Sequence, residues 1–210
     1  MDKPVVIIGA NGLGRVALDI FHSNDVMMYC FLDEDEQKFG KEIDTVTVVG
    51  SPDDEALFGL IGETVDVFVA TDDTDVKKDY IKRIKKERKT MPVNAVHKNT
   101  YISSTSKIGH GNLINSGASI NAFADLGNHC IVHSGAIIDF ETVIGDYAQI
   151  GVGATISSGV QIGEGAFIGA GAIIVSGIKI GKGARVGAGS VVVADVKAGA
   201  TVFGNPAKPV

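Results

Sequence analysis

The chain has 210 residues, of which 45% are hydrophobic and 21% charged, and a formal net charge of −6 at pH 7. This length fits one large domain or two small ones, and this composition is that of a folded soluble protein. The negative charge argues against a nucleic-acid binder, which usually carries a basic surplus. No apolar run approaches the ~20 residues that cross a bilayer, and the start "MDKPVVIIGANG" lacks a signal-peptide layout, so we expect a cytoplasmic protein. Cys30 and Cys130 are too few for a disulfide framework and should be buried thiols.

The first 93 residues alternate strand-like and helix-like segments. "PVVIIGANGLGRVALDIF" predicts a buried strand, a glycine-rich turn and a helix. Three more strands are expected in "VMMYCFLDED", where the strand ends at Asp33, in "VTVVGSPDD" and in "VDVFVATDDTD". Alternation of strands and helices is typical of a parallel sheet, so we expect a small Rossmann-like α/β domain at residues 1–93.

The segment "GANGLG", residues 9–14, follows the first strand and opens the first helix. At that place backbone amides can bind a phosphate group. The spacing G-x-x-G-x-G differs from the dinucleotide fingerprint, so the motif alone is weak. A strand-to-helix turn that simply requires glycine explains it equally well.

A basic segment ends this domain: eight of the chain's 19 Lys and Arg residues lie within residues 77–89. Val76, Tyr80, Ile81 and Ile84 recur at helical spacing, which predicts an amphipathic helix with its charges on the opposite, solvated side. Because the charged side of the helix carries no aromatic residue on which a base could stack, we do not expect a nucleic-acid surface.

A six-residue repeat occupies the rest of the chain. Every sixth residue from Ile102 to Val192 is aliphatic, and the position four residues later is mostly small. Twenty of the 27 glycines lie after residue 102. Helical and simple alternating patterns do not give this period, whereas a parallel β-helix, with one hexapeptide on each face of a coil, does. We therefore expect a β-helix domain at residues 94–210.

The repeated hexapeptides "QIGVGA", "QIGEGA", "FIGAGA" and "KIGKGA" resemble those of the hexapeptide-repeat acyltransferases. From "VVIIGANGLG" to the terminal "GNPAK", the chain resembles one branch, the bacterial sialic acid O-acetyltransferase and UDP-4-amino-sugar N-acetyltransferase family. The resemblance implies a left-handed β-helix, three hexapeptides per coil, and a homotrimer with active sites in the grooves between prisms. It implies an acetyl-CoA-dependent acetyltransferase that acts on a nucleotide-linked amino-sugar in surface glycan synthesis.

The resemblance also implies where the nucleotide binds. It places Gly12, Leu13 and Gly14 near the diphosphate and Asp33 near the base. After the last strand, the family has a glycine-aspartate-asparagine segment where this chain has Asp72, Asp73 and Thr74. An extra carboxylate that pointed inward would repel a diphosphate, so the nucleotide preference stays open.

The catalytic stretch departs from the family at its central residue. The family's base, a histidine, matches Phe140, although the flanking carboxylates Asp139 and Glu141 remain, and a second family histidine matches Gln149. Phenylalanine cannot accept a proton. Either His133, paired with one of these carboxylates, is the base, or a carboxylate acts alone on an amine that is partly deprotonated, or the protein binds its ligands without turnover.

For the acyl donor, the resemblance places the Ser158 amide at the thioester carbonyl and Ala170 and Ala188 along the pantetheine arm. It places Lys208, in "GNPAK", near the cofactor's phosphates. A zinc site like that of the hexapeptide-repeat carbonic anhydrases would need three converging histidines, for which His129, His133 and His110 are the candidates. No matching motif surrounds His110, and we expect no metal.

Overall fold

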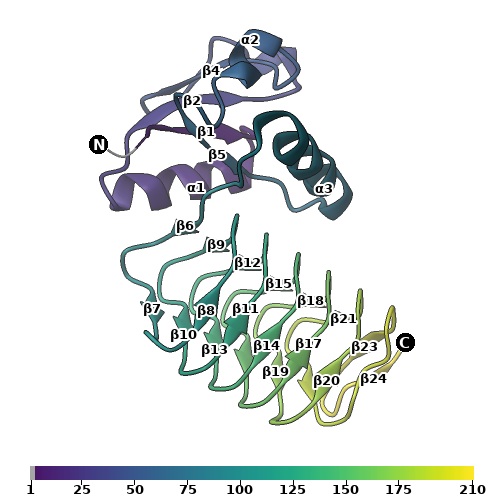
Figure 1. Cartoon of the computed structure of the whole chain (residues 1–210). Coiled ribbons are helices and arrows are strands. Elements are labelled where there is room, and N and C mark those ends of the chain that lie inside the picture. The colour runs from purple at the N-terminus through teal and green to yellow at the C-terminus, as the bar shows by residue number, and fades with distance from the viewer. Residues whose placement is uncertain (1–2) are drawn as a thin grey trace. The chain divides into compact units, whose positions relative to one another are not determined.

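The computed structural model describes residues 3–210, which divide into two compact units (Figure 1). The first unit ends at Lys98 and the second begins at Asn99. This division lies close to the predicted boundary between residues 93 and 94. The fold class is as predicted: an α/β domain followed by a long parallel β-helix.

The first unit is built on a five-stranded sheet with the strand order β3-β4-β2-β1-β5. Its pairs are parallel except β3 with β4. The strands are β1 (Val5–Ile8), β2 (Met28–Leu32), β3 (Glu42–Ile43), β4 (Val46–Gly50) and β5 (Asp66–Val69), and a short strand β6 (Ala95–Val96) lies near the end of the unit. The helices are α1 (Gly12–Ser23), the 3-10 turn η1 (Glu36–Lys38), α2 (Glu55–Gly59), α3 (Thr74–Arg83) and the π-helical turn η2 (Ile84–Arg88).

Short polar side chains begin the three α-helices of this unit. Asn11, Asp54 and Asp73 are the N-caps of α1, α2 and α3, and each side chain accepts hydrogen bonds from two backbone N–H groups of the first turn. These caps satisfy donors that a helix leaves without intrahelical partners. The central strand β1 is buried along its whole length, as expected for a parallel strand covered on two faces.

Close packing explains two glycines of "GANGLG". A Cβ on Gly14 would lie 2.0 Å from the Gly9 carbonyl oxygen. Gly9 has φ of +106°, and its Cβ would lie 2.6 Å from the Ala70 carbonyl oxygen. The turn can thus approach both α1 and the end of β5 only with glycine at these two positions.

The basic segment is less solvated than its sequence predicts. Lys77 is buried, with 4% of its surface exposed, whereas Val76, predicted on the core side, is 40% exposed. Arg83 lies over the Phe58 ring at 4.0 Å and forms an ion pair with Asp53 at 2.7 Å. The prediction that the charges lie on a solvated side is wrong for Lys77 and Arg83, because long cationic side chains can pack their stems and heads against the unit itself.

The second unit is a parallel β-helix whose coils repeat every 18 residues. Each coil contributes a two-residue strand to each of three sheets, which we call the first, second and third faces. The first face contains β7 (Tyr101–Ile102), β10 (Ser119–Ile120), β13 (Ile137–Ile138), β16 (Thr155–Ile156), β19 (Ile173–Ile174) and β22 (Val191–Val192). The second contains β8 (Lys107–Ile108), β11 (Asp125–Leu126), β14 (Val143–Ile144), β17 (Gln161–Ile162) and β20 (Lys179–Ile180). The third contains β9 (Leu113–Ile114), β12 (Ile131–Val132), β15 (Gln149–Ile150), β18 (Phe167–Ile168), β21 (Arg185–Val186), β23 (Thr201–Phe203) and β24 (Lys208–Pro209).

Four-residue turns connect the faces, and we call them the first, second and third corners after the face that each one follows. In one coil, residues 139–142 form the first corner, residues 145–148 the second and residues 151–154 the third. Backbone hydrogen bonds join equivalent turns of successive coils, as from Gly159 N–H to the Phe140 carbonyl at 3.1 Å. Residues 18 apart therefore stack in columns along each corner.

The second residue of each strand points into the coil and forms the aliphatic ladder that the repeat predicts. Ile120, Ile138 and Ile156 are successive rungs on the first face, and all are fully buried. The first residue of each strand points outward. On the first face this outward column contains Tyr101, Ile137, Ile173 and Val191 beside the polar Ser119 and Thr155, so that face is mostly apolar.

Both cysteines are buried, as predicted, and no disulfide joins them. Burial raises the pKa of the Cys30 thiol to about 11. Among residues 3–210, no helix is long and apolar enough to cross a membrane.

Candidate active and substrate-binding sites

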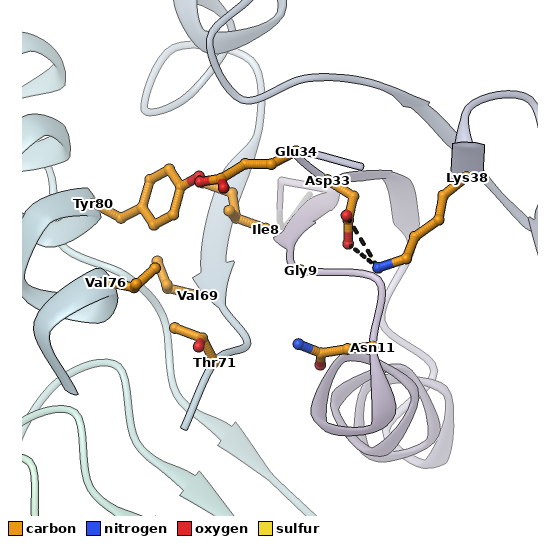
Figure 2. A pocket seen from close by; sticks show the side chains of 10 residues that line it. All are labelled: Ile8, Gly9, Asn11, Asp33, Glu34, Lys38, Val69, Thr71, Val76 and Tyr80. Carbon is orange, nitrogen blue, oxygen red and sulfur yellow. Dashed lines mark hydrogen bonds and ion pairs between the residues drawn. The ribbon is translucent and has the colours of Figure 1, made fainter. Parts of the chain in front are cut away.

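A pocket of about 170 Å³ opens in the first unit, at the carboxyl ends of β1, β2 and β5 (Figure 2). In an open α/β sheet, ligands bind outside the carboxyl ends of the strands where the direction of chain crossing changes. Ile8 and Val69 form the base of this pocket. Its sides come from Gly9 and Asn11 of the glycine turn, Asp33, Glu34 and Lys38 after β2, Thr71 after β5, and Val76 and Tyr80 of α3.

Asp33, predicted as a nucleotide contact, lies in this pocket and is 8% exposed. Its carboxylate accepts hydrogen bonds from Ala10 N–H at 2.7 Å and Asp35 N–H at 3.0 Å. Lys38 Nζ binds both carboxylate oxygens, at 2.9 and 3.0 Å. Burial by itself would raise the pKa of Asp33, but these hydrogen bonds and the Lys38 charge hold it below its usual value. The carboxylate is therefore ionised and tied to the turn after β1.

Tyr80 and Glu34 form the opposite wall, where the Tyr80 hydroxyl donates a hydrogen bond to the Glu34 carboxylate. Burial, together with this negatively charged acceptor, raises the pKa of Tyr80 well above its ordinary value. The hydroxyl thus stays protonated as a donor at neutral pH.

The other predicted nucleotide contacts lie beside this pocket rather than in its lining. Gly12, Leu13 and Gly14 form the first turn of α1, and the Leu13 and Gly14 N–H groups donate to Asn11 Oδ1 at 3.1 and 3.2 Å. These two amides are already engaged by the cap, although a phosphate could compete for them.

The two carboxylates of the segment after β5 do not line the pocket, so they need not face a diphosphate. Asp73 caps α3, and its Oδ1 accepts from Asp75 and Val76 N–H at 2.9 and 3.1 Å. Asp72 is exposed. The residue of this segment that lines the pocket is Thr71, which the sequence did not single out.

In the second unit, the first corner carries the predicted catalytic stretch. Asp139, Phe140 and Glu141 occupy one turn, and Phe140 is 48% exposed. Asn121, one coil earlier, donates to Asp139 Oδ1 at 3.2 Å. Ser158 stacks directly on Phe140 in the next coil, so the structure brings this predicted donor contact to the turn that holds Asp139, Phe140 and Glu141.

The third corner carries His133, Ala170 and Ala188. His133 is half-buried, Ala170 and Ala188 are exposed, and Gly189 N–H donates to the Ala170 carbonyl at 2.8 Å. Gln149 lies on β15 of the third face, and Lys208 lies on β24, which pairs antiparallel with β23.

The predicted catalytic residues of one chain thus fall on two corners. His133 follows β12 and Phe140 follows β13, so a strand of the first face separates them. The 18-residue spacing explains why Ser158 joins Phe140, whereas the spacing of seven residues places His133 at the neighbouring corner. One chain alone does not gather His133 and Asp139 at a single corner.

The candidate metal ligands are divided in the same way. His110 and His129 lie at the second corner, away from His133 at the third, and the His129 ring packs on Tyr147 with centroids 5.2 Å apart. Within the described residues 3–210, no group of three or more His, Cys, Asp or Glu side chains could hold a metal ion.

Comparison with known proteins identifies both units. The family model "PglD N-terminal domain" matches residues 4–84, and "Bacterial transferase hexapeptide (six repeats)" matches residues 141–176 and 159–194. A search of curated protein sequences found no match.

Several solved structures resemble the whole chain, among them PerB and the acetyltransferase domain of PglB. PerB from Caulobacter crescentus, in complex with CoA and GDP-perosamine, is 31% identical, with a TM-score of 0.89 over 99% of this chain and 97% of PerB. The acetyltransferase domain of PglB from Neisseria gonorrhoeae, in complex with acetyl coenzyme A, is 27% identical, with a TM-score of 0.91 over 100% of both chains.

The repeats, the two-unit fold and these similarities define a hexapeptide-repeat transferase with an N-terminal α/β domain. The chain belongs to the left-handed β-helix acetyltransferase family that carries a PglD-type N-terminal domain, and the resemblance predicted from the sequence is confirmed.

Proposed function

We propose that this protein transfers an acetyl group from acetyl-CoA to the amine of a nucleotide-linked amino-sugar, as a step in glycan synthesis. The observation that carries the proposal is the similarity of the whole chain, at 31% identity, to an enzyme solved with CoA and GDP-perosamine together. The pocket at the carboxyl ends of β1, β2 and β5 is the proposed site of the nucleotide.

Charge in the second unit supports CoA binding near its C-terminal coils. Five of the six Lys and Arg residues after Asn99 lie within residues 179–208: Lys179, Lys182, Arg185, Lys197 and Lys208. Of these, Arg185 and Lys208 lie on the third face, whose strands lead into the corner of Ala188, and are placed to attract the anionic phosphates of CoA, whereas Lys182 is paired with Glu164 at 2.9 Å. Ala170 and Ala188, exposed at the third corner, leave room for the pantetheine arm to run close to the backbone. Gln149, on the adjoining third face, completes the proposed CoA contacts.

In the reaction, the amine nitrogen attacks the thioester carbonyl carbon, a C–N bond forms, and the C–S bond breaks to release the CoA thiol. The oxyanion that develops needs a hydrogen-bond donor. The Ser158 N–H donates to no acceptor within residues 3–210 and lies one coil from the catalytic turn, which supports its assignment as that donor.

The amine must also lose a proton, and Phe140 cannot accept it. Asp139 and Glu141 flank this position, and His133 lies at the third corner. We propose His133 as the base, paired with one of these carboxylates. Because one chain holds these groups at two corners, the pairing requires a second copy of the chain.

A homotrimer that packs through the first face would supply that second copy. The outward column of this face is mostly apolar, apart from Ser119 and Thr155: Tyr101, Ile137 and Ile173 are 61%, 41% and 42% exposed in the single chain. The second face presents Lys107, Asp125, Gln161 and Lys179 in the same column, with Val143 as its one apolar member, and is more polar. An exposed apolar surface such as the first face is stabilised when it is buried between copies of the chain, so we propose this face as the trimer interface.

The alternative function is ligand binding without turnover, which the substitution at Phe140 favours. Release of the CoA thiol from acetyl-CoA by purified protein, with UDP-, GDP- and dTDP-linked amino-sugars as acceptors, distinguishes the two. We expect turnover with at least one acceptor, loss of turnover in His133→Ala, and no change in the control His110→Ala, which alters an exposed histidine at the second corner.

A different result would support ligand binding without turnover. If no acceptor supports turnover, but Phe140→His gains a rate enhancement of roughly 10²–10⁴, the range typical of a general base, the protein is a binding member of the family. The control for that variant is Phe123→His, since Phe123 lies one coil earlier at the same corner and is also exposed.

A further inference from the structure

The carboxylate at the end of β2 has no capacity left for a ligand. A carboxylate offers about four acceptor positions. Asp33 Oδ2 already accepts from Ala10 N–H and Lys38 Nζ, and Oδ1 accepts from Asp35 N–H and Lys38 Nζ. All four hydrogen bonds are 2.7–3.0 Å long, and the residue is 8% exposed. Asp33 is therefore occupied in holding the pocket together.

The group that Asp33 holds is still able to bind. An ammonium has three N–H donors, and Lys38 uses two of them on the two oxygens of Asp33. Its side chain is 33% exposed and lines the pocket, and it is the only cation among the ten lining residues of the described chain. Figure 2 shows its nitrogen directed to Asp33 above Asn11. The ion pair also cancels the negative charge that would otherwise repel a nucleotide.

We propose that Lys38, and not Asp33, contacts the nucleotide, and that Asp33 is a positioning residue that fixes the Lys38 ammonium. The inference rests on the proposed function for the kind of ligand. An ammonium donates and does not accept, so its partner is a hydrogen-bond acceptor of a nucleoside diphosphate, either on a phosphate or on the nucleoside. Because the Asp33 carboxylate already holds the Lys38 ammonium, the side chain loses little further conformational entropy when the ligand binds, and this favours affinity.

A double-mutant cycle tests this assignment by titrating GDP and UDP into the full-length protein. The variants are Lys38→Met, Asp33→Asn and the double variant, with Lys41→Met as the control because Lys41 is an exposed lysine nearby. We expect Lys38→Met to weaken binding by roughly ten- to a hundredfold, the range for a lost charge-assisted hydrogen bond. Because Asp33 acts through Lys38, the double variant should bind no more weakly than Lys38→Met alone. Lys38→Arg, which keeps a donor, should recover part of the affinity.

Two outcomes would overturn the inference alone: wild-type affinity in Lys38→Met, or a further loss of affinity when Asp33→Asn is added to Lys38→Met, which would mean that Asp33 meets the ligand directly. Failure of the wild type to bind any nucleoside diphosphate would overturn the proposed acceptor site as well. Thermal melting of each variant shows that it is folded. Titrations with guanosine and uridine show which part of the ligand Lys38 contacts. If Lys38→Met weakens the binding of GDP and UDP but not of the nucleosides, the contact is with phosphate. If it weakens the binding of nucleosides and diphosphates equally, the contact is with the nucleoside.

Discussion

Neighbouring residues on β14 allow a direct test of the inward ladder. Ile144 points inward and is 2% exposed, between Leu126 and Ile162 of the adjoining coils, whereas Val143 points outward and is 47% exposed. Ile144→Ala removes three buried carbons, worth ~0.8 kcal/mol each, and leaves a cavity, so the expected loss of stability is about 3 kcal/mol. Val143→Ala removes two carbons that are about half exposed, for an expected loss of about 0.8 kcal/mol.

Urea unfolding followed by far-ultraviolet circular dichroism measures the difference, since the chain has no tryptophan. Solenoids need not unfold in one step, so the midpoints are the quantity to compare. At a slope of about 2 kcal/mol per molar urea, Ile144→Ala should lower the midpoint by roughly 1.5 M and Val143→Ala by less than about 0.5 M. Equal shifts for the two variants would refute the inward and outward assignment of the strand residues.

Three further predictions concern the interface, the thiols and the pocket. Ile173→Asp, on the first face, should shift the protein from trimer to monomer in light scattering, while Gln161→Asp on the second face should not; an unchanged trimer would move the interface elsewhere. Cys30, buried and with its pKa raised to about 11, should not react with a thiol reagent in the native protein and should react once the protein is unfolded in urea. The folded pKa of Asp33 is depressed, so its stabilisation is present above the ordinary carboxyl value of about 4 and is lost as the pH falls through the folded value. The urea midpoint should therefore fall less between neutral pH and pH ~3 in Lys38→Met than in the wild type, and equal falls would contradict the ion pair.

The β-helix could be predicted because its period is local and repeated. One aliphatic residue in six, sustained from Ile102 to Val192, is compatible with few other structures, and it fixes which residues share a column. That is why the stacking of Ser158 on Phe140 follows from a spacing of 18. The separation of His133 from Phe140 follows from the same arithmetic, once the corners are known.

The pocket of the first unit could be predicted only in part. Asp33 could be predicted because it closes the second strand and matches the aspartate that the family places near the base. Its saturation by Lys38, five residues later through η1, depends on how that turn folds back and has no periodic signature. The burial of Lys77 and exposure of Val76 were missed for a related reason: helical spacing gives the faces of α3 but not the exact rotation at which it packs.

Because the coils repeat every 18 residues, the place of a residue in the second unit is defined by the number of its coil and by its position within that coil. Removing one complete coil before Phe140 would shift every later residue by one step of about 4.8 Å along its own corner and leave its orientation unchanged. The last coil is shorter, since Val186 pairs with Val202, 16 residues later, and Val202 is still buried; a corner can therefore lose two residues while the ladder stays inward. Removing one complete coil between Phe140 and the C-terminal coils would shorten the distance between them by the same fixed step of about 4.8 Å.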